Sequence, residues 1–166
     1  MNIFIAGGGR VGFHLARLLS AESHDLTVIE SDPNQVEQID YALDVSTVHA
    51  SAASALVQQE IGVADADLFI SVTGRDEVNL VAAATAKGLG AREVVARVDD
   101  RVYLESAMLY ESILNVDYIL SPEALTALEI ANYVENPGIV AAQEVGRGLV
   151  QMRQMRVAKS PTTNGK

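Results

Sequence analysis

The sequence predicts an α/β fold, a doubly wound, Rossmann-like parallel sheet with helices on both faces and a short C-terminal extension. Short apolar runs alternate with helix-like runs along residues 1–135, a pattern typical of βαβ units with right-handed crossovers. The first apolar run breaks directly into Gly7-x-Gly9-x-x-Gly12, which suits a strand-to-helix turn. Hydrophobic residues make up 49% of the chain and aromatic residues only 5%, a balance that favours a sheet buried on both faces.

The alternation predicts each element in order. We expect strands at residues 3–6, 26–30, 47–49, 68–72, 94–97 and 118–120. We expect helices at residues 11–21, 33–42, 53–60, 77–87, 101–110 and 122–134. Pro33 and Pro122 fit the first helical turn, with Asp32 and Ser121 as N-caps. The helix at 77–87 is apolar nearly all round, which predicts burial on more than one side, by the core or by a second subunit.

Charge divides the chain unevenly. Residues 1–135 hold 21 acidic and seven basic residues, a net charge of −14, whereas residues 136–166 carry a net charge of +4. With Asn136-Pro137-Gly138, this shift predicts a boundary between a domain at 1–135 and a linker, or the start of a C-terminal domain, at 136–166. An ordinary exposed connector is the alternative. Residues 139–145 and 149–157 fit a hairpin or two connecting strands, and the polar residues 160–166 a disordered tail.

Composition excludes several classes of function. The chain has no cysteine, so disulfides, thiolate metal sites and cysteine nucleophiles are excluded. Its three histidines, His14, His24 and His49, have no metal-ligand spacing. No apolar run reaches the roughly 20 residues that span a bilayer, and no signal peptide is visible, so we expect a cytoplasmic protein. The overall charge of −10 argues against nucleic-acid binding.

The glycine turn predicts a phosphate site. In such a turn Gly7 allows the tight bend, Gly9 lets the backbone approach a pyrophosphate, and Gly12 lets the helix pack against the strand. The N–H groups at the helix start then face the phosphates. Glu30, 18 residues after Gly12, is placed to accept hydrogen bonds from ribose hydroxyls and to repel a 2′-phosphate, which favours NAD over NADP. Asp32 is a second candidate, although an N-cap role suits it better.

Further candidates lie along the same edge of the sheet. Arg10 lies inside the glycine turn and can reach phosphate oxygens, with solvent exposure as the alternative. Thr73 and Gly74 follow the fourth strand, where a hydroxyl and an open backbone suit ribose or phosphate contacts. Arg97 ends the fifth strand and can face phosphate or carboxylate. The alternative for Arg97 is an ion pair with a nearby acid: Asp76, Asp99 or Asp100.

The sequence favours a sensor over an enzyme. No His, Lys or Tyr stands where a general acid is obvious, and the thirty or so residues after the sheet are too few for a substrate domain. One alternative to a sensor is the NAD-binding fragment of a dehydrogenase that lacks its substrate domain. The other alternative is a structural Rossmann module with an empty site.

Several of these segments together resemble the TrkA-N, or RCK (KTN), domain family of potassium-transport regulators. The segments are residues 7–12, 28–32, 66–79, 95–98 and 119–123, of which 66–79 is the least expected in a generic dehydrogenase. The resemblance implies a Rossmann domain that dimerises and forms a cytoplasmic ring beneath a potassium channel or transporter. It implies NAD(H) as the ligand, and in some members ATP or ADP.

Residue by residue, the resemblance places a ligand against Gly7, Gly8, Gly9, Arg10, Val11, Glu30, Thr73, Gly74 and Arg97. It implies that Arg10 meets the γ-phosphate of ATP near a subunit boundary. Many members have Gly-Asp-Ala or Gly-His-Ala after the third strand, where this chain has Ala50-Ser51-Ala52, so an adenine contact there would go through Ser51. Full-length members continue into a C-terminal domain, which suggests a fragment or a truncated form.

The resemblance therefore predicts a regulatory, non-enzymatic nucleotide-binding subunit of a potassium uptake system. It would form a homo-oligomer, sense NAD(H), ATP or ADP, and lie at the inner face of the membrane through its transporter partner. The acidic domain would complement basic cytoplasmic loops of that partner.

Overall fold

The structure is a computed structural model that describes residues 1–135, 139–145 and 150–155. The chain divides into two compact units, Met1–Pro122 and Glu123–Lys166, and each is described by itself. The predicted domain boundary near residue 136 lies outside the described residues, so it stays a prediction.

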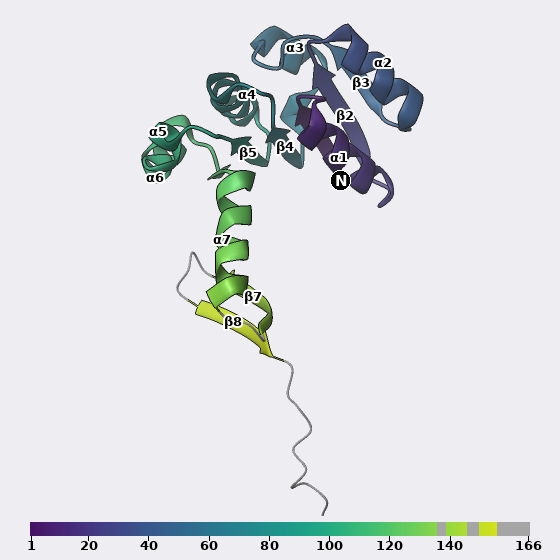
Figure 1. Cartoon of the computed structure of the whole chain (residues 1–166). Coiled ribbons are helices and arrows are strands. Elements are labelled where there is room, and N and C mark those ends of the chain that lie inside the picture. The colour runs from purple at the N-terminus through teal and green to yellow at the C-terminus, as the bar shows by residue number, and fades with distance from the viewer. Residues whose placement is uncertain (136–138, 146–149, 156–166) are drawn as a thin grey trace, which may run out of the picture. The chain divides into compact units, whose positions relative to one another are not determined.

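The first unit is built on one six-stranded sheet in which every neighbouring pair of strands is parallel. Its strand order is β3-β2-β1-β4-β5-β6, so the direction of winding reverses between β1 and β4 (Figure 1). This confirms the doubly wound fold, and the reversal is the position where such sheets bind ligands. The strands are β1 (Asn2–Ala6), β2 (Asp25–Glu30), β3 (Ser46–His49), β4 (Leu68–Ser71), β5 (Glu93–Arg97) and β6 (Tyr118–Leu120).

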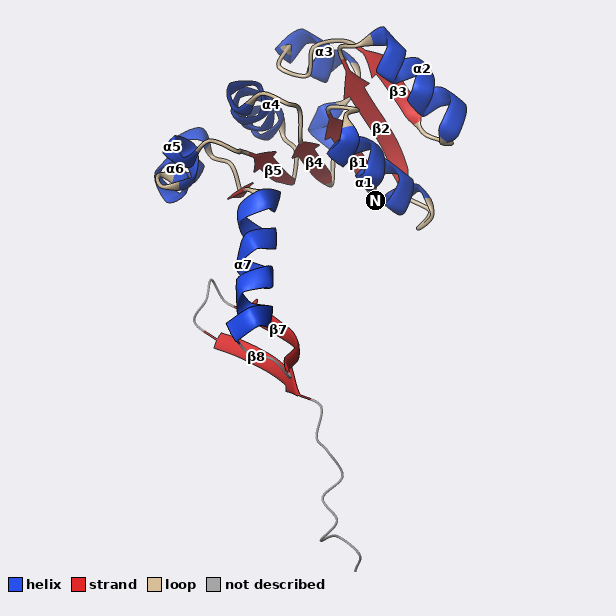
Figure 2. Cartoon of the chain, in the orientation of Figure 1, coloured by secondary structure: helices blue, strands red, loops and turns tan. Residues whose placement is uncertain are grey.

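Helices cover both faces of this sheet (Figure 2). Because side chains alternate along a strand, Ile3 and Ile5 of β1 join a core with α1 and α2, whereas Phe4 and Ala6 join the opposite core with α4. All four side chains are at most 3% exposed. The helical elements of this unit are α1 (Arg10–Ser20), α2 (Pro33–Ala42), α3 (Ala55–Glu60), the 3-10 turn η1 (Val63–Asp65), α4 (Asp76–Leu89), α5 (Arg101–Leu104) and α6 (Ala107–Leu114).

Most predicted elements are present, with differences at their ends. The helix predicted at 101–110 is two short helices, α5 and α6, because the backbone at Ser106 leaves the helical region with φ −114°. Asp32 caps α2 as predicted, accepting a hydrogen bond from the Asn34 amide at 2.9 Å. Helix α4 buries Leu80, Ala82, Ala83 and Ala86 in the core, but Val81 stays 51% exposed.

The second unit contains α7 (Pro122–Glu135), of which Pro122 belongs to the first unit, and an antiparallel pair formed by β7 (Ile139–Val145) and β8 (Val150–Met155). The antiparallel pairing agrees with the hairpin alternative for this region. The tail predicted at 160–166 lies outside the described residues. Within the part that is described, no helix is long and apolar enough to cross a membrane.

Candidate functional site

The glycine turn between β1 and α1 brings three backbone segments into close contact. Gly7 has φ +104°, and a Cβ atom there would lie 2.8 Å from the Thr73 amide nitrogen. A Cβ atom on Gly12 would overlap the Gly7 carbonyl oxygen. These contacts confirm that Gly7 makes the tight turn and that Gly12 allows close packing of helix and strand.

The start of α1 is open. Gly9 is the N-cap residue, no side chain caps the helix, and its first turn holds no acidic residue. A Cβ atom on Gly9 would meet only Gln35 Oε1, at 3.7 Å. The N–H groups of the first turn therefore have no capping side chain and lie at the positive end of the helix dipole, an arrangement that suits an anion.

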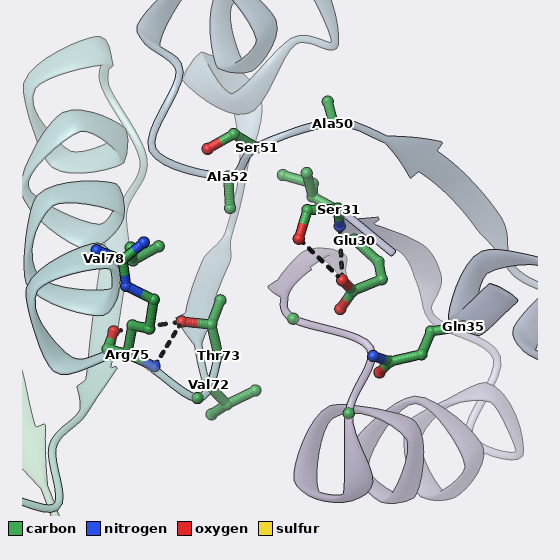
Figure 3. Close-up of a pocket in the computed structure, with 14 residues that line it drawn as sticks. Glu30, Ser31, Gln35, Ala50, Ser51, Ala52, Val72, Thr73, Arg75 and Val78 are labelled. Atoms are coloured by element: carbon green, nitrogen blue, oxygen red, sulfur yellow. Dashed lines mark hydrogen bonds between the residues drawn. The ribbon is translucent and has the colours of Figure 1, made fainter. Parts of the chain in front are cut away.

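A pocket of about 540 Å³ opens beside this turn, at the carboxyl ends of β1, β2 and β4. Figure 3 shows Glu30 and Ser31 on one side of it and Thr73 with Arg75 on the other. The residues that line it are Gly7, Gly9, Ile29, Glu30, Ser31, Gln35, Ala50, Ser51, Ala52, Val72, Thr73, Gly74, Arg75 and Val78.

Glu30 holds the glycine turn to the end of β2. Its side chain is nearly buried, and Oε2 accepts a hydrogen bond from the Gly8 amide at 2.5 Å. Oε1 accepts from the amides of Ser31 and Asp32, at 2.6 and 2.8 Å. Because each carboxylate oxygen has two lone pairs, Oε2 keeps one acceptor position, and the residue lines the pocket. Its contact with a ribose remains a prediction.

Asn79 shapes the opposite wall, the loop between β4 and α4. It is fully buried, and its Oδ1 accepts hydrogen bonds from the Thr73 amide and hydroxyl at 2.8 and 2.7 Å, and from the Ser71 hydroxyl at 3.1 Å. Its Nδ2 donates to the carbonyls of Thr73 and Arg97 at 3.0 and 2.9 Å. One amide side chain therefore fixes the conformation of Thr73 and the start of the loop that carries Gly74.

Gln58 fixes the third wall, the segment after β3 that contains Ser51. Its Nε2 donates to the carbonyls of Ala52 and Ala82, at 2.7 and 3.0 Å, and the residue is fully buried. The Ala50 amide donates to the Glu30 carbonyl at 2.9 Å. The segment is thereby joined to β2 on one side and α4 on the other.

The basic residues of 1–135 fall into two groups. Four of the seven have a carboxylate partner, in the pairs Lys87–Asp117 (2.8 Å), Arg92–Asp67 (3.9 Å), Arg97–Asp99 (2.6 Å) and Arg101–Glu105 (3.2 Å). Among residues 1–135, Arg10, Arg17 and Arg75 form no ion pair within 4 Å. All three line either this pocket or a neighbouring hollow. The cations without carboxylate partners are therefore concentrated at one corner of an acidic domain.

The structure brings most of the predicted site residues together. Gly7, Gly9, Glu30, Ser51, Thr73 and Gly74 line the pocket, whereas Gly8 and Arg10 line the neighbouring hollow. Val11 and Arg97 line neither, and the Arg97 side chain pairs with Asp99, one of the three alternatives considered.

Sequence reasoning missed Arg75 and Gln35. The sequence could have indicated Arg75 as a site residue, since it comes directly after Thr73-Gly74 at the carboxyl end of a strand. No sequence feature indicated Gln35 as a site residue beyond its place in the first turn of α2.

The acidic groups nearby give no metal site. Among the residues that the structure describes, no three His, Asp or Glu side chains gather closely enough to hold a metal ion. The pKa of Asp32 lies below its ordinary value because the Asn34 amide and the Gln35 side chain donate hydrogen bonds to its carboxylate.

The fold and the glycine turn define a Rossmann-type domain with a pocket at the point where its winding reverses. The TrkA-N domain model matches residues 3–122. The chain belongs to the TrkA-N domain family.

Relatives of known sequence agree with this assignment. The chain is 37% identical over 166 residues to a Trk system potassium uptake protein TrkA homolog from Archaeoglobus fulgidus, covering 100% of this chain and 38% of the relative. It is 34% identical over 154 residues to the Trk system potassium uptake protein TrkA of Halomonas elongata, covering 92% and 34%. The chain thus spans little more than a third of the length of these two relatives.

Solved structures show the same fold. The TrkA-N domain of the inner membrane protein ybaL from Escherichia coli superposes with a TM-score of 0.70 at 21% identity, covering 80% of this chain and 96% of that domain. The GsuK channel bound to NAD gives a TM-score of 0.66 at 21% identity, covering 87% of this chain and 25% of the channel chain. A further GsuK structure is bound to ADP, with a TM-score of 0.61 at 22% identity, covering 72% and 31%.

Proposed function

We propose that this chain is the nucleotide-binding regulatory module of a potassium uptake system. Its ligand is a nucleotide with a diphosphate, either NAD(H) or ADP and ATP. The observation that carries the proposal is the open start of α1 beside a pocket that holds an arginine with no carboxylate partner. Helix N–H groups and a guanidinium are the donors that a pyrophosphate requires. The relatives named as potassium uptake proteins and the GsuK structures with NAD and ADP support the choice.

The pocket walls suggest how each part of the ligand is held. Phosphates would lie at Gly9 with Arg75 opposite, and the ribose would lie at Glu30. The adenine would lie along the Ala50–Ala52 segment, where Ser51 supplies a hydroxyl in place of a charged side chain. A carboxylate at the ribose favours a free 2′-hydroxyl over a 2′-phosphate.

Regulation requires that the ligand distinguish two arrangements of the protein, because only different affinities for the two can shift their populations. We place that difference between copies of this chain in a homo-oligomer on the cytoplasmic side of a membrane transporter. The domain's net charge of −14 over residues 1–135 suits basic cytoplasmic loops of the transporter. Capture of the transporter should weaken as salt rises, and capture that is indifferent to salt and to charge reversal would argue against this contact.

Calorimetric titration of the full chain with NAD, NADH, ADP and ATP tests the binding role. We expect at least one of these nucleotides to bind to the wild type, and Arg75→Gln to weaken it about tenfold, the effect of one charge-assisted hydrogen bond. Arg101→Gln is the matched control, because that exposed arginine at the start of α5 pairs with Glu105 and does not line the pocket. Equal losses in the two variants would refute the role of Arg75. Turnover of NADH with small oxo-acids would instead support a dehydrogenase fragment.

A further inference from the structure

The wall of the nucleotide pocket that follows β3 offers few polar groups to a ligand. It is formed by Ala50, Ser51 and Ala52, which Figure 3 shows together along one side of the pocket. Two of these three residues have only a methyl side chain. The Ser51 hydroxyl is therefore the one polar side-chain group that this segment presents, and the segment has no charged group.

The Ser51 hydroxyl can take either role in a hydrogen bond. The other hydroxyls that line the pocket already have partners: Ser31 donates to Glu30 Oε1 at 3.2 Å, and Thr73 donates to Asn79 Oδ1 at 2.7 Å. Ser51 is exposed, and its hydroxyl forms no hydrogen bond with any residue that the structure describes. A hydroxyl has one donor and two acceptor lone pairs, and it rotates to suit its partner. Ser51 can therefore donate to a ligand or accept from it.

The backbone around Ser51 is held on both sides. The Ala50 amide donates to the Glu30 carbonyl at 2.9 Å, and the Ala52 carbonyl accepts from Gln58 Nε2 at 2.7 Å. Gln58 is fully buried, so water does not compete for the second bond. The segment thus keeps its position, and rotation of the hydroxyl is what adapts it to different ligands.

Purine bases differ at the edge that such a hydroxyl would contact. The amino group at C6 of adenine donates hydrogen bonds, whereas the oxygen at C6 of hypoxanthine and guanine accepts them. A side chain that only accepts, such as a carboxylate, would favour adenine and repel a 6-oxopurine. A hydroxyl suits either edge, and in an exposed position water can bridge any bond that it leaves unmade.

We propose that the base site of this pocket binds 6-oxopurines as well as adenine, and that Ser51 is the residue that determines this tolerance. The inference rests on the nucleotide-binding role proposed above, with the base along the Ala50–Ala52 segment. It widens the ligand class from adenine nucleotides to purine nucleotides that contain a diphosphate. Selectivity for the ligand then comes from the phosphate and ribose walls, at Gly9, Arg75 and Glu30.

The first test compares nucleotides that differ only at the base, by calorimetry on the full chain. ADP is paired with inosine diphosphate, and NADH with its hypoxanthine analogue. Each pair exchanges the C6 amino group for oxygen without the additional amino group of guanine. In the wild type, the affinities within a pair should agree within about threefold, because the same exposed hydroxyl forms one hydrogen bond in either case. This comparison needs no substitution, so it does not depend on the folding of a variant.

The second test adds one negative charge at two different places. Ser51→Asp puts an acceptor-only side chain at the base edge, so it should weaken the hypoxanthine nucleotide at least about tenfold relative to its adenine partner. Gln59→Glu is the matched control, because Gln59 is exposed on α3 and does not line the pocket. In this control the ratio of adenine to hypoxanthine affinity should equal that of the wild type.

Two results would overturn the proposal. A wild-type preference for adenine well above about threefold would refute the tolerance, since one exposed hydroxyl would not then explain the selectivity. Equal affinity ratios in Ser51→Asp and Gln59→Glu would refute the role of Ser51. Absence of binding by ADP, NADH and both hypoxanthine nucleotides would instead refute the proposed function.

Discussion

Replacement of Asn79 by alanine should release the wall of the pocket that carries Thr73. The substitution removes five hydrogen bonds from a fully buried side chain, including those to both the amide and the carbonyl of Thr73. At roughly 0.5–1.5 kcal/mol for each of the five bonds, the expected loss in the free energy of unfolding is about 2.5–7.5 kcal/mol. Such a loss is a large part of the roughly 5–15 kcal/mol that stabilises an ordinary domain.

Urea denaturation of the full chain, followed by circular dichroism, measures this loss. Asn34→Ala is the matched control, since Asn34 is exposed on α2 and should change the unfolding free energy by no more than about 0.5 kcal/mol. Nucleotide affinity should fall with Asn79→Ala at temperatures where the variant is still folded, because the loop is no longer preorganised. If Asn79→Ala unfolds at the same urea concentration as Asn34→Ala, the side chain does not hold the loop.

Three further predictions concern the glycine turn and its surroundings. Gly12→Ala should lower the free energy of unfolding by about 1–3 kcal/mol, because its Cβ atom would overlap the Gly7 carbonyl. Gly88→Ala, at an open helical position, should instead raise the Tm slightly. Equal Tm values for the two variants would contradict this. Glu30→Gln should lower the free energy of unfolding, measured by chemical denaturation, by about 1–3 kcal/mol. The NH2 group of the glutamine would face a backbone N–H donor in either orientation of the amide. An unchanged free energy of unfolding would contradict this. The pKa of Asp32 is lowered in the folded chain, so its contribution to stability is present at neutral pH and is lost as pH falls through that pKa; an NMR titration midpoint at the ordinary aspartate value would contradict this.

The backbone of the site could be predicted from sequence because each rule it follows is local. Gly7 and Gly12 are required by the turn itself, and Asp32 precedes a proline at a helix start. The doubly wound parallel sheet also follows from the alternation of elements, because right-handed crossovers leave few topologies for a parallel sheet.

The side-chain network of the site could not be predicted, because its partners are distant in sequence. Asn79 bonds to the carbonyl of Arg97, 18 residues away, and Gln58 bonds to that of Ala82, 24 residues away. The neighbouring sequence does not indicate that either side-chain amide is buried. Arg97 shows the same limit, since its place on a strand end was clear but its pairing with Asp99 was only one of several alternatives.

The central claim, that the open glycine turn receives the phosphates of a nucleotide, is tested most directly at Gly9. A methyl group fits there in the free protein, because its nearest neighbour would be 3.7 Å away, yet it would stand between the backbone and a phosphate. The account predicts by calorimetry that NADH, ADP or ATP binds to the wild type and to Gly88→Ala, and binds at least about tenfold more weakly to Gly9→Ala at unchanged Tm, a loss of about 1.4 kcal/mol. Equal affinity in Gly9→Ala and the wild type, or no binding by any of the three nucleotides, would contradict it.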